Sequence, residues 1–128
     1  MTASDNTRKH CIIIALGTNV RHEDNMACAL RRLQDIISDM KCSRQLWTKP
    51  IGIKSCDFMN MLLSGVCELD RPTLLQKIKL IEKECGRSYE DKANGIVKID
   101  IDLLKYDDTK EHVDDWNRDY VKLLIKEL

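Results

Sequence analysis

Apolar and polar residues follow two different periods along the chain. Residues 10–17 form a short, Ile-rich run that ends at a glycine, which is typical of a buried strand. Residues 22–38 carry apolar side chains at helical spacing, with charged residues largely between them. Residues 72–85 repeat that spacing, begin at a proline and precede a glycine. The pattern therefore predicts a strand over the first segment and a helix over each of the other two.

Three further segments favour strands, and the tail favours a helix. Residues 41–48 and 58–69 are separated by a short loop with a proline and a glycine, so they can pair as antiparallel strands. Residues 97–108 begin with alternating apolar and charged positions, and residues 114–128 predict a short last helix. The order β-α-β-β-α-β predicts an α+β, ferredoxin-like sandwich. Its four-stranded antiparallel sheet would have helices on one face and an extra C-terminal helix.

Composition narrows the class of protein. A length of 128 residues predicts a single domain over residues 1–128, with a flexible polar end at residues 1–9. Lys plus Arg and Asp plus Glu both number 21, so no general attraction to nucleic acid or an anionic membrane is expected. The single Phe counts against an RNA-binding sheet. Apolar runs are too short for a membrane span or a signal core, and we expect a cytoplasmic monomer.

The six cysteines lie at wide, irregular spacings and include no CxxC pair. This spacing argues against a zinc site and a thioredoxin-like motif. Cys28 and Cys85 fall at core-facing positions of the two predicted helices. We interpret the cysteines as small buried hydrophobic residues in a reducing compartment.

Two carboxylates stand side by side on the last predicted strand. Asp100 and Asp102 occupy positions i and i+2 of a strand, so they point the same way, about 6–7 Å apart at their Cα atoms. Like charges at this separation repel, and a divalent cation relieves the repulsion. Carboxylate oxygens suit Mg²⁺, which also binds substrate phosphates. The alternative is a solvated face with two ordinary aspartates, although strands disfavour Asp.

Five segments in chain order resemble the motifs of one enzyme family. They are IALGTN (14–19), TKPIG (48–52), FMNMLLSG (58–65), IEKECGR (81–87) and IDIDLL (99–104). Together they are similar to the 6-hydroxymethyl-7,8-dihydropterin pyrophosphokinases of folate biosynthesis. The resemblance spans nearly the whole chain and agrees with the fold predicted from periodicity.

The resemblance implies a reaction and a set of residues. Members of this family transfer a pyrophosphoryl group from the co-substrate ATP to the pterin hydroxymethyl group, with two Mg²⁺ ions. Asp100 and Asp102 match its metal-binding aspartates. The positions that match pterin contacts are Thr48, Ile51 and Asn60 at the pterin edge, and Phe58 and Tyr120 at its two faces. The positions that match ATP contacts are Lys79, which differs from the family's usual residue type, His112 and Arg118. Lys92 is a further ATP-binding candidate, and Arg87 and Lys98 join the two aspartates as candidate catalytic residues.

The sequence also departs from the family pattern. Val97 stands where the family motif has an arginine, and residues 87–95 carry fewer basic and aromatic residues than expected. We hypothesise that Lys98 or Lys92 supplies part of the missing charge. The polar, Gly-containing composition of residues 87–95 suits a lid over ATP, and the sequence leaves open whether they close. An impaired member that binds a pterin or nucleotide without efficient turnover is the alternative. A third possibility is an unrelated ferredoxin-like domain for protein contacts, which the ordered motifs count against.

Overall fold

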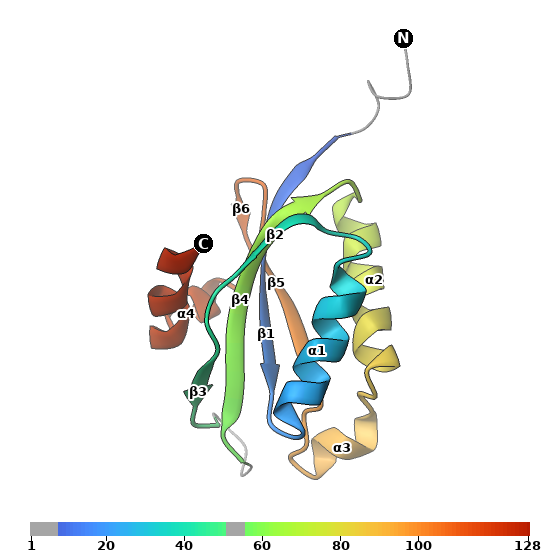
Figure 1. Cartoon of the computed structure of the whole chain (residues 1–128), viewed down its shortest axis with the longest axis vertical. Helices are drawn as coiled ribbons and strands as arrows, with labels where there is room; N and C mark the ends of the chain where they lie inside the picture. The colour runs from blue at the N-terminus through green and yellow to red at the C-terminus, as the bar shows by residue number, and fades with distance from the viewer. Residues whose placement is uncertain (1–7, 51–55) are drawn as a thin grey trace.

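A twisted antiparallel sheet forms the centre of the structure, a computed structural model that describes residues 8–50 and 56–128 (Figure 1). In the described part of the chain the strands run in the order β2-β4-β1-β5-β6, and β3 also pairs with β4. Their bounds are β1 His10–Thr18, β2 Ser38–Cys42, β3 Leu46–Thr48, β4 Phe58–Cys67, β5 Asp100–Tyr106 and β6 Thr109–Lys110. The α+β class and the antiparallel sheet are therefore confirmed. The predictions for residues 1–7 and for Ile51 lie outside the described residues.

The described sheet has six strands rather than the predicted four, partly because the segment 41–48 is two strands. Ser43 separates them, and its backbone N–H donates to the Leu62 carbonyl at 2.8 Å. The Ser43 hydroxyl accepts the Leu62 N–H at 2.9 Å, which places a side chain where a regular ladder has a backbone carbonyl. The chain bends there and pairs again with β4 through β3. The other added strand, β6, pairs with the end of β5.

Two helices cover one face of the sheet and bury the residues that their periodicity selects. Helix α1 spans His22–Leu33 and helix α2 spans Arg71–Glu84. The prediction that α1 continues to residue 38 is wrong, because Ser38 already begins β2. Helix α2 begins where expected, since the Asp70 side chain accepts the Thr73 N–H at 2.9 Å. These helices and the sheet enclose the larger core cluster.

The C-terminal helix lies on the opposite face of the sheet (Figure 1). Successive residues of β1 point to opposite faces, so Ile14 and Leu16 belong to the larger core while Ala15 faces the tail. Val121 and Leu124 pack there in a second cluster. The predicted single helix over 114–128 is instead three short pieces: η2 Val113–Asn117, α4 Asp119–Leu124 and η3 Ile125–Glu127. No helix in the described ranges is both long and apolar enough to cross a membrane.

The segment before β5 is not a strand, which changes the orientation of its side chains. The predicted strand 97–108 begins only at Asp100, and the predicted loop 87–95 contains the short helix α3, Tyr89–Ala93. Asn19 binds this segment: its side chain donates to the Gly95 carbonyl at 2.8 Å and accepts the Val97 N–H at 2.7 Å. Its backbone N–H also donates to the Val97 carbonyl at 3.0 Å.

The ion pair between Arg71 and Glu111 joins the start of α2 to the chain beyond β6. We expect this contact to weaken in acid. The Arg71 guanidinium holds the pKa of Glu111 below its usual value of 4.5. The pair therefore stabilises the fold above pH 4.5, and this contribution disappears as the pH falls through the lower folded-state pKa. We expect Glu111→Gln to lower the unfolding temperature at pH 6 but much less at pH 3. An equal loss at both values would contradict this assignment.

Candidate active site

A pocket of about 520 Å³ opens on the α4 face of the sheet, at the N-terminal end of α4. The strand register explains which side chains meet there. Gly17 on β1 pairs with Asn60 on β4 and with Asp100 on β5, and Ala15 pairs with Asp102. Directly paired residues share a face of the sheet, so these side chains belong to one surface. The tail adds Asp115 and Asn117 from η2, Arg118, and Asp119 and Tyr120 from the start of α4.

Asn60 and Thr48 form the polar wall of the pocket on β4 and β3. The Asn60 amide nitrogen donates to the Thr48 hydroxyl at 2.5 Å, and Asn60 is buried. Gly17 allows this arrangement, because a Cβ atom built on it would lie 3.0 Å from the Asn60 amide oxygen. Phe58 and Tyr120 also line the pocket, and burial raises the pKa of the Tyr120 hydroxyl. Neighbouring strands thus bring amide, hydroxyl and ring groups to one place.

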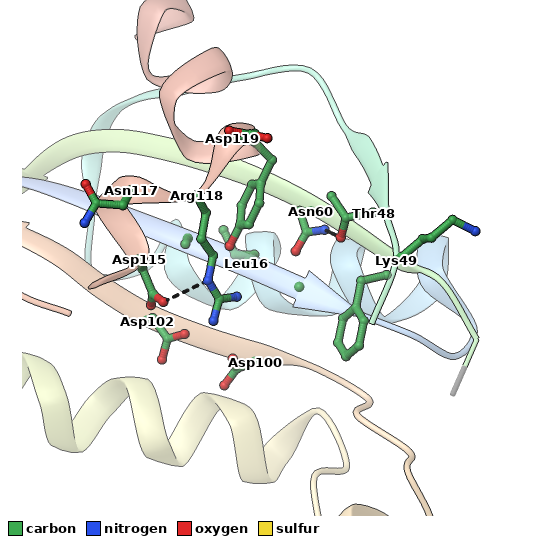
Figure 2. Close-up of a pocket in the computed structure, with 14 residues that line it drawn as sticks. Leu16, Thr48, Lys49, Asn60, Asp100, Asp102, Asp115, Asn117, Arg118 and Asp119 are labelled. Carbon is green, nitrogen blue, oxygen red and sulfur yellow. Dashed lines mark hydrogen bonds and ion pairs between the residues drawn. The ribbon is translucent and has the colours of Figure 1, made fainter. Parts of the chain in front are cut away.

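Asp100 and Asp102 face the pocket from β5 (Figure 2). Burial raises the pKa of Asp102 to about 8, and repulsion from Asp100 adds to the increase. His112 Nε2 lies 4.0 Å from the Asp102 carboxylate. The oxygen donors and the repulsion between the two carboxylates fit a hard cation such as Mg²⁺. The described residues contain no group of three or more His, Cys, Asp or Glu that could hold a metal, so other ligands would be water or phosphate oxygens.

Arginines contact the carboxylates from two sides. Arg87, just after α2, donates to Asp100 at 2.8 Å and to Glu82 at 2.7 Å. Arg118 points toward the two β5 aspartates in Figure 2, and its Nε lies 3.2 Å from the Asp115 carboxylate. One arginine is thus committed to Asp100, while the other projects into the pocket.

Glu82 is a site residue to which the sequence analysis assigned no role, although it lies in the IEKECGR motif (81–87). Its carboxylate accepts the Ile101 N–H at 2.8 Å as well as the Arg87 guanidinium. Burial raises the pKa of Glu82, and only 13% of its side chain is exposed. Glu82 therefore fixes the strand residue that separates Asp100 from Asp102. A charged residue one turn beyond the buried Ile78 of α2 was the available signal.

The structure does not bring every expected residue to the pocket. Lys98 was expected beside the two aspartates, but it precedes β5 and pairs with Asp91 at 3.0 Å. Lys79 is exposed on α2 and does not line the pocket. Lys92 lies on α3, and its side chain is outside the described part of the structure. Lys49 lines the pocket but was not among the predicted site residues.

The fold and the site define an α+β domain with paired carboxylates opposite a polar and aromatic pocket wall. A model of the 7,8-dihydro-6-hydroxymethylpterin-pyrophosphokinase (HPPK) family matches residues 13–128. The chain therefore belongs to the HPPK family, and the resemblance found in the sequence is confirmed.

Two curated relatives match this chain at similar sequence identity. A folate synthesis bifunctional protein from Arabidopsis thaliana is 34% identical over 108 residues, which cover 82% of this chain and 22% of the relative. A 2-amino-4-hydroxy-6-hydroxymethyldihydropteridine pyrophosphokinase from Aquifex aeolicus (strain VF5) is 33% identical over 99 residues, or 76% of this chain and 61% of the relative. The matched part of the chain thus spans less than two-thirds of either relative.

Proposed function

We propose that this protein transfers a pyrophosphoryl group from ATP to 6-hydroxymethyl-7,8-dihydropterin, a step of folate biosynthesis. The observation that carries the proposal is one pocket in which Asp100 and Asp102 face Asn60, Thr48 and two aromatic rings, in a chain of the HPPK family. In this reaction the hydroxyl oxygen of the pterin bonds to the β-phosphorus of ATP, and AMP leaves. The HPPK name of the Aquifex relative supports the same assignment.

The polar wall of the pocket suits a pterin. The fused pyrimidine edge of a pterin presents alternating donors and acceptors, and the Asn60 amide and Thr48 hydroxyl can answer both kinds. Phe58 and Tyr120 would stack on the flat ring system. Ile51 stays a predicted contact at the pterin edge.

The carboxylates and the basic residues suit the triphosphate. Asp100 and Asp102 would hold magnesium, with two ions expected from the family. When bound, Mg²⁺ neutralises phosphate charge at the reacting centre. Arg118 and His112 would contact the phosphates, while Arg87 orients Asp100. Roles for Lys79, Lys92 and Lys98, and closure of residues 87–95 over ATP, stay predictions.

The test is AMP release from ATP and Mg²⁺ in the presence and absence of the hydroxymethyl-dihydropterin. Pterin-dependent AMP that is lost in Asp100→Ala and retained in Asp108→Ala supports the proposal. Asp108 is the matched control, because it is exposed beyond the end of β5. Pterin or nucleotide binding without AMP would support an impaired member, for which Val97 is the motivating residue. Binding of neither ligand would rule out both.

The Gly17→Ala substitution is expected to weaken pterin binding about tenfold, since the new methyl group displaces the Asn60 amide by a fraction of an ångström. The affinity for a non-hydrolysable ATP analogue serves as the internal control and should stay within about twofold of the original. Titration calorimetry with each ligand measures both. Unchanged pterin affinity would remove Asn60 from the proposed binding site.

The broader expectations stay predictions. They are the ferredoxin-like arrangement of the two βαβ halves, a single domain over residues 1–128, a monomeric state and a cytoplasmic location.

A further inference from the structure

Two cysteines outside the pocket meet where α1 and α2 pack together. Cys28 lies on α1 and is half-buried, whereas Cys85 is buried at the end of α2. The two thiols interact, since each contributes to the shift in the other's pKa. Cys85 belongs to the larger core cluster, and Cys28 packs against that cluster. Helix packing therefore brings together two sulfur atoms that are far apart in the sequence.

Arg32 completes this cluster one turn after Cys28 on α1. Its guanidinium donates to the Glu84 carboxylate at 3.0 Å, which holds it over the end of α2. An interaction with the Cys28 thiol raises the pKa of this guanidinium. Its Nε–H is buried and has no partner at hydrogen-bond geometry in the described structure. A buried donor of this kind stabilises negative charge on sulfur or on a sulfur-bound oxygen.

The two thiols differ in acidity. Burial acts to raise the pKa of Cys28, but the hydrogen bond with Cys85 and the charges of Arg32 and Arg31 outweigh it, so this pKa is lowered. Burial raises the pKa of Cys85 to about 12, and the ionised neighbour adds to the increase. Cys28 is therefore the thiol that ionises, while Cys85 keeps its proton.

We propose that Cys28 and Cys85 form an oxidisable thiol pair, in which a hydroperoxide attacks Cys28 and Cys85 then closes a disulfide between α1 and α2. The juxtaposition of the two thiols with Arg32 carries this proposal. The disulfide would tether the end of α2 to α1, directly before Gly86 and Arg87. It would thereby restrain the segment whose arginine binds Asp100.

The chemistry balances in two steps. The Cys28 thiolate attacks the peroxide oxygen, so an S–O bond forms, the O–O bond breaks, and hydroxide or alkoxide leaves. Cys28 is then a sulfenic acid. The Cys85 sulfur displaces its hydroxyl group, so the S–S bond forms and the S–O bond breaks. The thiol proton leaves with that hydroxyl as water. The two sulfurs lose two electrons, which reduce the hydroperoxide to water or an alcohol.

Other cysteines provide a comparison for reactivity. Desolvation raises the pKa of the Cys42 thiol, which lies on β2. Burial also raises the pKa of the Cys67 thiol on β4. Since peroxide reacts with the thiolate, these two residues should oxidise more slowly than Cys28.

The test treats the reduced full chain with stoichiometric hydrogen peroxide, alkylates the remaining thiols and maps the peptides by mass spectrometry. The expected product has a single linkage, between Cys28 and Cys85, formed in the unmodified chain without any substitution. The Cys85→Ala variant should stop at a Cys28 sulfenic acid that a dimedone probe captures. The Cys42→Ala variant is the control and should form the linkage at an unchanged rate.

The Arg32→Met variant separates chemistry from proximity. It keeps both thiols and should slow Cys28 oxidation about tenfold for each pKa unit that the lost charge restores. Linkage of either cysteine to another residue would overturn the proposal. So would Cys28 oxidation no faster than that of Cys42. These readouts do not involve AMP release, so they are independent of the proposed function.

Discussion

The Asp102→Asn substitution is expected to lower the rate of pterin-dependent AMP release by at least about 10³-fold, while the protein stays folded. The carboxylate faces the pocket beside Asp100, and its charge would bind the cation that offsets the phosphates. Asparagine keeps the size of the side chain but removes that charge. The initial rate of AMP release at saturating ATP and Mg²⁺ measures the effect.

The same substitution should not lower the unfolding temperature of the metal-free protein. In the metal-free protein Asp102 repels Asp100 in a partly buried setting, so the neutral asparagine should leave the unfolding temperature unchanged or raise it. Added Mg²⁺ should raise the unfolding temperature of the original protein and have little effect on the variant. A variant that retains both turnover and the Mg²⁺ response would contradict the metal-binding role of Asp102.

The Glu82→Ala substitution is expected to cost about 2–3 kcal/mol of unfolding free energy, since it leaves the Ile101 N–H without its acceptor. It also removes one of the two carboxylates that hold Arg87. The two β5 aspartates then lose their fixed spacing, so AMP release should fall about 10²-fold. Urea unfolding and the rate of AMP release measure the two effects separately.

Two further variants separate positioning from a general loss of stability. Glu84→Ala, two residues further along α2, removes an ion pair that is about 40% exposed on both sides and should lower the free energy of unfolding much less than Glu82→Ala does. Glu82→Gln keeps an acceptor for the Ile101 N–H but not the negative charge beside Arg87. It should recover most of the stability and less of the turnover. Equal recovery of both would make Glu82 a purely structural residue.

Local sequence signals predicted the elements that rest on a continuous period. The Ile-rich run of β1 and the apolar stripe of α2, with its proline at the start and the glycine that follows it, specify their elements almost alone. The ends of an element were predicted less accurately where contacts with distant segments determine them. Ser43 divides the 41–48 segment by bonding to Leu62, and the side chain of Asn19 holds Val97 outside the sheet. Neither bond has a signal within its own segment, because each partner is distant in the chain.

The sequence by itself determined the α+β class, the alternation that points Asp100 and Asp102 the same way, and the ordered motifs of the HPPK family. Only the tertiary structure decided what surrounds those carboxylates. Strand pairing placed Asn60 opposite Gly17, and the end of α2 placed Glu82 against Ile101. The tertiary structure also pairs Lys98 with Asp91 and does not place it beside the two aspartates. Periodicity fixes the face on which a side chain lies, whereas its partners depend on packing between distant segments.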